Sequence, residues 1–478
     1  MQVDWQLRNS WNSDRDAAYA EAVRRIERCI ELQEDRLYLG DVKLDRLPPA
    51  LSSLTWLRDV DLYGSPITDL TSLAQLVNVQ QLKVGSLNSP SPALDFLDGW
   101  RELRGLQLIS TTLLNLAPLR SCQQLTQLYI SCSQHAVELR NLEALDGLPF
   151  LKQVSFLKMQ ADQFSTIGTW RSLEFLQLID TNLSDLRGFD QLIHLAHLNV
   201  SGSRISDLSP LSTLPRLREL VLAETNVHDL APLASLSPLE ELILARTPVS
   251  TLRPLIDLAS VQRGIHDCRG LRRIDLSGCP IDDLAPLSGF ARLEGVDLSD
   301  TPVTSVEPLH GLKALRSLNL KQTPVRTLGP RGTLSGLAGL DARDTPLNDL
   351  SALEPARSLQ SIDISGTCVT DLTPLRDALN CRTLILRGSR VADLSPLIET
   401  GSREDDHRYS RQLLDFRDTP VAHADDRLTA LAALANTDGG ECFHETKQYL
   451  HAQRRADRAG AGRSVWQLLG MGKSDRND

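Results

Sequence analysis

Hydrophobic residues recur at one spacing along most of the chain, most clearly from Leu195 onward. There the sequence reads LAHLNVSGSRISDLSPLSTLPR, then LRELVLAETNVHDLAPLASLSP, then LEELILARTPVSTLRPLIDLAS. Superposition of the three segments gives the template LxxLxLxxTxVxDLxPLxxLxx, with a period of 22 residues. A fixed period of this length is typical of a stacked-repeat architecture.

Each repeat combines a short strand with a tight turn. In the repeat that begins at Leu217, Leu220 and Leu222 form one buried face of a strand. The next apolar residues, Leu230 and Leu233, flank an Ala-Pro pair that favours a compact coil or a single 3₁₀ turn. One such unit cannot bury its apolar side chains alone, whereas stacked copies share a continuous core and join their strands into one parallel sheet.

With this motif the chain resembles leucine-rich-repeat proteins of the 22-residue class, and it is similar to the bacterial internalins and to the leucine-rich regulatory subunit of protein phosphatase 1. The resemblance implies an α/β repeat solenoid, a horseshoe with a long curved parallel sheet. It also implies 3₁₀ turns and coil on the convex side and helical caps at both ends.

One column of the repeat departs from that family, which usually has Asn at the ninth position, bonding the backbone between neighbouring turns. We expect a ladder of hydroxyl groups to replace the amide ladder, because a threonine hydroxyl can both donate to and accept from the backbone. The column comprises Thr181, Ser203, Thr225, Thr247, Cys279, Thr301, Thr323, Thr345, Thr367, Ser389 and Thr419.

Departures from the period divide the chain. Residues 1–34 contain a tail and an amphipathic helix between Ser13 and Glu34, which we expect to seal the start of the stack. This helix is followed by a strand and an RLPPAL turn, and the three together also resemble the first residues of bacterial leucine-rich arrays that are fused to signalling domains. The repeats then fill residues 35–422, about sixteen turns, with insertions near 85–92, 131–138, 258–270 and 400–410.

Residues 423–478 no longer follow the template. The pattern predicts a helix over 425–436, a break at Gly439 and Gly440, a second helix over 441–459, and a short third helix near Trp466 before a polar tail. We interpret this region as a C-terminal cap, since a terminal repeat must cover its neighbour's apolar face. The alternative is a docking or signalling function in the last 20 residues.

Composition narrows the possible functions. The formal net charge of −10 argues against a general nucleic-acid binder, which would present a basic face. There is no signal-peptide core and no apolar run of about 20 residues, so we expect no membrane span. We therefore expect a cytoplasmic bacterial protein, or one delivered to a host cell without a classical signal peptide.

The candidates for catalysis or metal binding are weak. Eight cysteines form no CxxC pair, so we expect mostly buried, reduced thiols. Residues 472–474 imitate the end of a phosphate-binding loop but lack its upstream glycine. Cys442 lies on a different helix face from His444, and His266 and Cys268 fall in an insertion that we interpret as a solvated loop. We expect no enzyme activity, no cofactor and no metal.

The outward surface of the sheet follows from the spacing. Residues two, four and six positions after the first leucine of each repeat point away from the core, onto the concave face. The middle repeats place an apolar set there, comprising Ile109, Tyr129, Leu157, Phe175, Ile179, His197, Val221 and Ile243. Later repeats place a charged set there, which includes Asp275, Asp297, Arg343 and Arg387. Exposed apolar patches mark partner sites, whereas charged residues can serve only to keep a sheet soluble.

We therefore predict a non-enzymatic scaffold that binds a protein partner through its concave sheet and loop insertions, with Tyr129 and Phe175 as anchors. One alternative is a recognition or effector component of a bacterial defence or host-manipulation pathway, signalling through the C-terminal helices. The other is a small catalytic module in the tail, for which one cysteine in about 55 residues offers little support. The partner and the oligomeric state stay open.

Overall fold

The fold is taken from a computed structural model that describes residues 15–65, 67, 69–85, 94–110, 114–132, 137–161, 164–264, 270–378, 380–399, 413–435 and 439–458. Several expectations concern residues outside these ranges: the tail before Arg15, the insertion at 400–410, His266 with Cys268, the third helix and residues 472–474. The chain forms two compact units, which meet in the sequence between Leu242 and Ile243.

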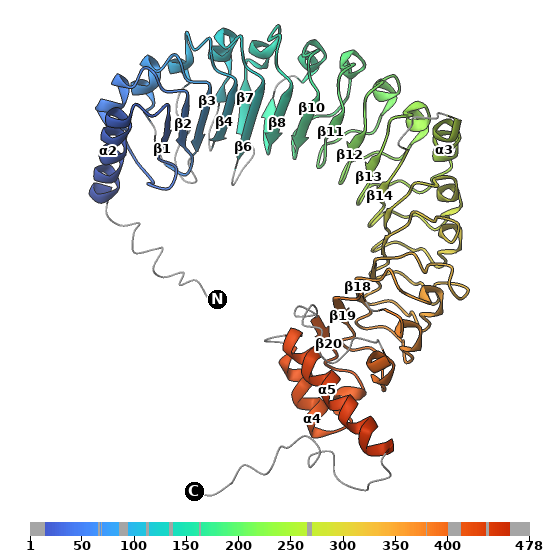
Figure 1. Ribbon diagram of the computed structural model, residues 1–478. Coiled ribbons are helices and arrows are strands. Elements are labelled where there is room, and N and C mark those ends of the chain that lie inside the picture. The colour runs from blue at the N-terminus through green and yellow to red at the C-terminus, as the bar shows by residue number, and fades with distance from the viewer. Residues whose placement is uncertain are drawn as a thin grey trace, which may run out of the picture. The chain divides into compact units, whose positions relative to one another are not determined.

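The first unit begins with a helix and continues as a ladder of parallel strands. Helix α2 (Arg15–Leu32) packs against β1 and the first 3₁₀ turn. The ladder comprises β1 (Arg36–Tyr38), β2 (Asp59–Leu62), β3 (Gln81–Gly85), β4 (Gly105–Ser110), β6 (Gln127–Cys132), β8 (Gln153–Leu157), β10 (Phe175–Ile179), β11 (His197–Asn199) and β12 (Glu219–Val221). Its strands line the inner side of this unit and its 3₁₀ turns the outer side (Figure 1).

The 3₁₀ turns of the first unit occupy the part of each repeat where the Asp-Leu-x-Pro segment was expected to turn. They are η1 (Pro49–Ser53), η2 (Thr71–Gln75), η3 (Asp95–Leu97), η4 (Ala117–Ser121), η5 (Leu142–Leu145), η6 (Ser165–Thr169), η7 (Phe189–Gln191), η8 (Ser209–Leu211) and η9 (Ala231–Ser235). The expected repeat of strand and 3₁₀ turn is confirmed.

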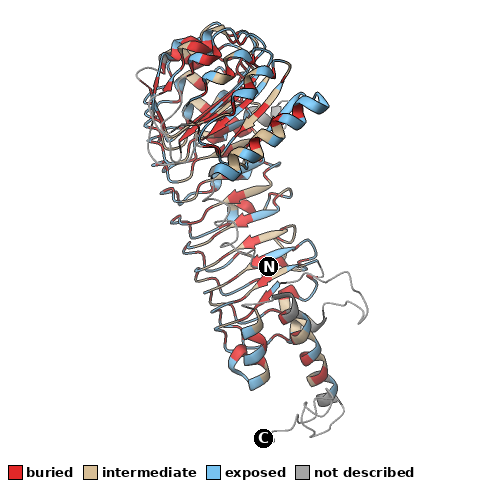
Figure 2. Ribbon diagram, turned by 90° about the vertical axis from the view of Figure 1, so that its left-hand side faces the viewer, coloured by how far each residue is buried: buried red, intermediate tan, exposed pale blue. Residues whose placement is uncertain are grey.

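The core consists of leucine columns that run from turn to turn. Strand register pairs Leu176 with Leu198 and Leu198 with Leu220, and all three are fully buried. Figure 2 shows a similar recurrence of buried residues on successive strands of the second unit. Because the register does not shift, each repeat covers the apolar side chains of the next, as the period predicts.

A second, small sheet lies in the irregular repeats of the first unit and was not expected from the sequence. It consists of β5 (Leu114–Asn115), β7 (Val137–Arg140) and β9 (Met159–Ala161), all parallel. The side-chain amide of Asn182 ends it by bonding both the backbone N–H and the C=O of Ala161, each at 3.0 Å. Strand β7 begins within the insertion near 131–138, and β5 and β9 pair with it from the neighbouring repeats.

The second unit repeats the same construction. After β13 (Glu241–Ile243), at the boundary, its strands are β14 (Arg273–Asp275), β15 (Gly295–Asp297), β16 (Ser317–Asn319), β17 (Gly339–Asp341), β18 (Ser361–Asp363), β19 (Thr383–Ile385) and β20 (Leu413–Asp415). Its 3₁₀ turns are η10 (Ala285–Gly289), η11 (Glu307–Leu309), η12 (Ser351–Leu353), η13 (Thr373–Leu375), η14 (Ser395–Glu399) and η16 (Val421–His423).

Helices replace or follow repeats at three places in this unit. Helix α3 (Leu255–Gly264) occupies the start of the insertion that was expected to be a solvated loop, so that interpretation is wrong for these residues. Helix α4 (Asp426–Leu434) starts at the N-cap Asp425, whose carboxylate accepts from Leu428 N at 2.8 Å. Helix α5 (Gly439–Arg458) contacts β20 and η14, and its first turn contains Gly439 and Gly440, which were expected to precede it.

The hydroxyl column differs from the expected ladder. The Oγ1 of Thr323 donates to Leu320 O at 2.7 Å, and Thr225, Thr247, Thr301 and Thr345 bond the carbonyl three residues back in the same way. These threonine bonds stay within one turn. Two other residues at this position reach the preceding turn: Ser65 Oγ bonds Leu39 O and Leu44 N, and Cys279 Sγ contacts Leu244 O at 3.1 Å.

The residue before this column makes the sharpest bend of each repeat. Backbone φ is positive there in glycines such as Gly202 and Gly366, and equally in side-chain-bearing residues such as Glu224, Gln322 and Asp344. A left-handed residue redirects the chain from the strand into the outer segment. The hydroxyl bond of the next residue closes this corner.

Replacing Thr323 with Val should lower the free energy of unfolding by about 1 kcal/mol, because the hydroxyl bond is lost while Leu320 O keeps its bond from Thr323 N. Urea unfolding of both proteins measures this difference. Thr213→Val is the matched control at an exposed position, and it should change stability by less than about 0.5 kcal/mol. Equal effects of the two substitutions would contradict a structural role for the column.

Candidate functional site

The strand register arranges the outward side chains of the first unit in three rows. The first row contains residues two positions after the first leucine of each repeat, the centre row those four positions after, and the last row those six positions after. In β10 these are Phe175, Gln177 and Ile179, all half-buried, between the buried Leu176 and Leu178. In β10 the spacing of the leucines therefore separates the buried positions from the outward ones.

The predicted apolar residues do not form one column. Phe175 and His197 lie side by side in the first row. Tyr129 and Val221 lie in the centre row, and Ile109, Leu157 and Ile179 in the last row. The two anchors are separated by β8 and lie in different rows, because the sequence changes the position of its apolar outward residue from repeat to repeat. Ile243 belongs to the second unit.

Exposure differs within this set. Tyr129 is 37% exposed, whereas Ile109, Leu157, Phe175, Ile179, His197 and Val221 are half-buried. The short side chains of Ser131 and Ser155 beside it are buried. Tyr129 therefore projects from its surroundings and presents its ring to solvent.

A polar chain holds the first-row aromatic pair in place. The rings of Phe175 and His197 stack with centroids 4.3 Å apart and planes 7° apart. The Nδ1 of His197 lies 2.6 Å from Glu219 Oε2, and its Nε2 lies 3.4 Å from Gln177 Nε2. Ser155 Oγ in turn donates to Gln177 Oε1 at 3.1 Å.

The tautomer of His197 sets the direction of the bonds in this chain. With the proton on Nδ1, Gln177 donates its amide N–H to His197 Nε2 and the imidazole donates to Glu219. The four residues come from the consecutive strands β8, β10, β11 and β12. Their mutual bonds fix the side-chain rotamers, so a partner that contacts this pair would order few additional torsions.

Two further exposed aromatic residues lie on the same face and were not predicted. Tyr38 is 57% exposed in the centre row, where it pairs with Asp61, and Tyr63 is 42% exposed six positions after Leu57. Counting from Leu57 reaches Tyr63, whereas Tyr38 has Glu34 four positions before it and is placed only by its pairing with Asp61.

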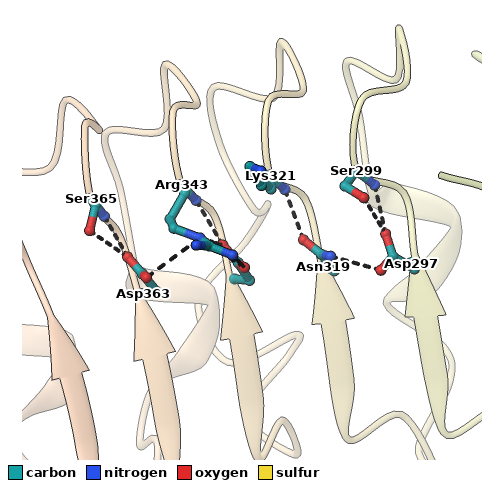
Figure 3. A network of polar contacts seen from close by, with 8 residues as sticks. Asp297, Ser299, Asn319, Lys321, Arg343, Asp363 and Ser365 are labelled. Atoms are coloured by element: carbon teal, nitrogen blue, oxygen red, sulfur yellow. Dashed lines mark hydrogen bonds and ion pairs between the residues drawn. The ribbon is translucent and has the colours of Figure 1, made fainter. Parts of the chain in front are cut away.

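The charged set of the second unit has partners within the chain. Asp275 Oδ1 accepts from Ser277 N at 2.9 Å, and Asp297 Oδ1 from Ser299 N at 2.9 Å. This Asx turn recurs at the ends of β16, β17 and β18 (Figure 3). It is also present at the end of β20. The carboxylates therefore satisfy backbone N–H groups where each strand ends.

The arginines complete this network. Arg343 forms a bidentate pair with Asp341 and reaches Asp363 Oδ2 at 3.5 Å (Figure 3). Arg387 Nε donates to Asp418 Oδ2 at 3.0 Å. On this face Asp341, Asp363, Asp415 and Asp418 pair with arginines, whereas Asp275 and Asp297 accept from backbone, hydroxyl or amide groups.

The pKa values of two aspartates in this network are shifted in opposite directions. Burial raises the pKa of Asp363, and the neighbouring Asp341 carboxylate adds to the effect. Burial also acts on Asp415, which is 7% exposed, but the hydrogen bonds from Arg417 outweigh it and lower the pKa of that carboxyl. The Asp415 side chain is buried, whereas that of Asp363 is half-buried.

The thiols show no sign of activation. Burial raises the pKa of Cys122, Cys381 and Cys442 to about 11. The seven cysteines in the described part of the chain are unpaired and at least half-buried, as predicted. Within the same ranges, no three His, Cys, Asp or Glu side chains gather as metal ligands would.

These turns, ladders and corners define the fold of leucine-rich-repeat proteins. The chain is similar to the LRR protein LIC12759 of Leptospira interrogans, with a TM-score of 0.60 and 15% identity over 82% of this chain and 93% of that one. It is also similar to the functional domain of InlJ from Listeria monocytogenes, with a TM-score of 0.53 and 19% identity over 73% and 71%. The expected likeness to internalin-type arrays is therefore confirmed.

A third similar structure is the LRR ectodomain of the plant membrane receptor kinase GASSHO1/SCHENGEN3 from Arabidopsis thaliana, with a TM-score of 0.54 and 18% identity over 80% of this chain and 48% of that one. No family model and no curated protein matches the sequence. None of the described helices combines the length and the apolar character that a membrane crossing needs.

Asp363→Asn and Asp415→Asn should change stability in opposite directions. The raised pKa of Asp363 means that its charged form, present at pH 7, destabilises the fold. Asp363→Asn should therefore raise the urea midpoint at pH 7. This gain should vanish as the pH falls through the range of that pKa, because the native carboxyl then becomes neutral as well. The pKa of Asp415 is lower in the folded than in the unfolded protein, so its charged carboxylate stabilises the fold at pH values above the unfolded-state pKa. Asp415→Asn should therefore cost about 1–3 kcal/mol at pH 7, and this cost should shrink as acid protonates the native carboxyl. Two pH series of urea unfolding measure both effects, and a shared sign would contradict the assignments.

Proposed function

We propose that this chain is a non-enzymatic scaffold that binds a protein partner through the outward sheet face of its first unit. The observation that carries the proposal is the aromatic set fixed on consecutive strands, with Tyr129 projecting and Phe175 held against His197. Aromatic side chains dominate the binding energy of many protein interfaces. The half-buried Ile109, Leu157 and Ile179 extend the apolar area beside them.

The rigidity of the ladder supports the same proposal. Each outward side chain stands on a strand that is hydrogen-bonded on both sides, and Ser155, Gln177 and Glu219 hold the aromatic pair. A partner that docks here would pay little ordering entropy on the side of this chain. A flexible loop with the same residues would bind more weakly.

The plant ectodomain offers a precedent for the class of function. Its structure is a complex with CASPARIAN STRIP INTEGRITY FACTOR 2, so an array with this fold can hold a partner. At 18% identity this supports a binding role in general and names no partner for this chain.

The proposed binding surface includes neither the charged outward residues of the second unit nor the thiol of Cys442. Cys442 is buried, donates to Leu431 O at 3.1 Å, and has its pKa raised to about 11, which disfavours a nucleophile. We interpret α4 and α5 as the C-terminal cap, because α5 packs against both β20 and α4.

Substituting Tyr129 and Phe175 together by Ala should weaken a partner by more than about 2 kcal/mol while leaving the fold intact. The experiment compares affinity capture from the native cell by the wild type and by the double variant, followed by Kd measurement for the protein that is lost.

A matched control comes from two exposed apolar residues in turns before β8 and β11, Phe150 and Ile193, which are 47% and 52% exposed. The double Ala variant of this pair should bind as the wild type does. Equal affinity of the Tyr129 and Phe175 variant would remove the sheet face of the first unit as the docking surface.

A further inference from the structure

The central strands of the first unit present an uncharged face. Strands β4, β6, β8 and β10 place twelve residues in the three outward rows, and none of them is charged. In the whole chain 23% of residues are charged, and the net charge is −10. The centre of a protein interface shows the same depletion of charge together with enrichment in tyrosine and phenylalanine.

Glutamine takes the place of the missing charges. Each of the four strands has one outward glutamine: Gln107, Gln127, Gln153 and Gln177. Gln177 is used within the chain, because it bonds Ser155 and contacts His197. The amides of Gln107, Gln127 and Gln153 bond no other group in the described ranges, and Gln127 and Gln153 are exposed.

These glutamines do not form the Asx turn that Asp or Asn forms at the centre row of other repeats. At the centre row Asp61, Asn199 and Asp297 each accept a backbone N–H two residues on and end the strand in an Asx turn. Gln107 and Gln177 occupy the same row with a side chain one methylene longer, and their strands continue for five or six residues. The backbone does not use the outward amide of Gln107, so the amide is available to a partner.

Charges return at the borders of this face. At the start of the strands Lys152 pairs with Glu174 at 2.7 Å, and Arg104 is exposed. Beyond their ends lie Lys158 and Asp180, both at left-handed corners. The arrangement of an uncharged centre and a charged border is that of a specific docking surface.

We propose that this face, the amide face of β4, β6, β8 and β10, binds an extended, uncharged polypeptide segment of the partner. The proposal rests on the proposed function and adds the chemistry of what is bound. A primary amide offers both a donor and an acceptor, which matches the N–H and C=O of a peptide main chain. A charged side chain would lose its hydration here without meeting an opposite charge.

The dimensions of the face fit such a segment. Three inter-strand steps of about 4.8 Å span about 14 Å from β4 to β10, which matches about four residues of extended chain. Tyr129 lies within this span beside Gln127, so one aromatic contact and several amide contacts fall along the same stretch.

The test uses a library of random 12-residue peptides displayed on phage and selected on the full-length chain. Selected peptides are then measured by fluorescence anisotropy against the wild type and against the double variant Gln127→Glu with Gln153→Glu. The control variant Gln123→Glu with Gln160→Glu adds the same charge at two other exposed glutamines of the first unit. A set of neutral oligosaccharides is screened in parallel.

The proposal predicts peptides depleted of Asp, Glu, Lys and Arg relative to the unselected library. Their Kd should change less than about twofold between about 50 and 500 mM salt, rise at least about tenfold in the Gln127 and Gln153 variant, and stay unchanged in the control.

Other outcomes overturn it in distinguishable ways. Selected peptides that are charged, but need Tyr129 and Phe175, would overturn this inference and leave the proposed function standing. Peptides that bind every sheet-face variant equally, the absence of selected peptides, or binding of oligosaccharides at this face would overturn both.

Discussion

Parallel strands of successive repeats pair in unshifted register, and the rest of the structure depends on that pairing. Leu106, Leu128 and Val154 meet at one level of the ladder, as Ile274, Val296 and Leu318 do in the second unit. Backbone hydrogen bonds and leucine burial favour the same alignment, so a repeat that slipped by one residue would lose both. Everything outside the core is therefore arranged at intervals set by the ladder.

That regular spacing gives one position different roles in different repeats. Asp or Asn in the centre row bonds its own backbone and ends the strand, as Asp363 does with Ser365. On β4, β6 and β8 the same row contains Gln107, Tyr129 and Ser155, which leave the strand free to continue. Strands with Asp or Asn in this row thus use its polar group to close a turn, and these three strands do not.

Features that interrupt the period were the hardest to foresee. Part of one insertion forms the start of β7, which joins β5 and β9 in a second sheet, and part of another insertion forms α3. A repeat template describes only the positions it contains, so it makes no statement about the structure of added residues. The position of the hydroxyl column was predicted correctly, but the acceptor of its hydrogen bonds was not. Which carbonyl a hydroxyl reaches depends on the side chain and on the backbone geometry of the preceding left-handed residue.

The sequence by itself determined the winding, the core and the outward positions, since the spacing of leucines leaves one way to bury them. It also placed Tyr129 and Phe175 on the surface of the sheet. Only the tertiary structure decided which outward residues meet: that Phe175 stacks on His197, that Arg343 joins Asp341 to Asp363, and that Asp415 is buried. The contacts of His197 with Gln177 and Glu219 and that of Arg343 with Asp363 join residues 20 or more positions apart. Side-chain rotamers and neighbouring strands decide such contacts, and a linear pattern does not encode them.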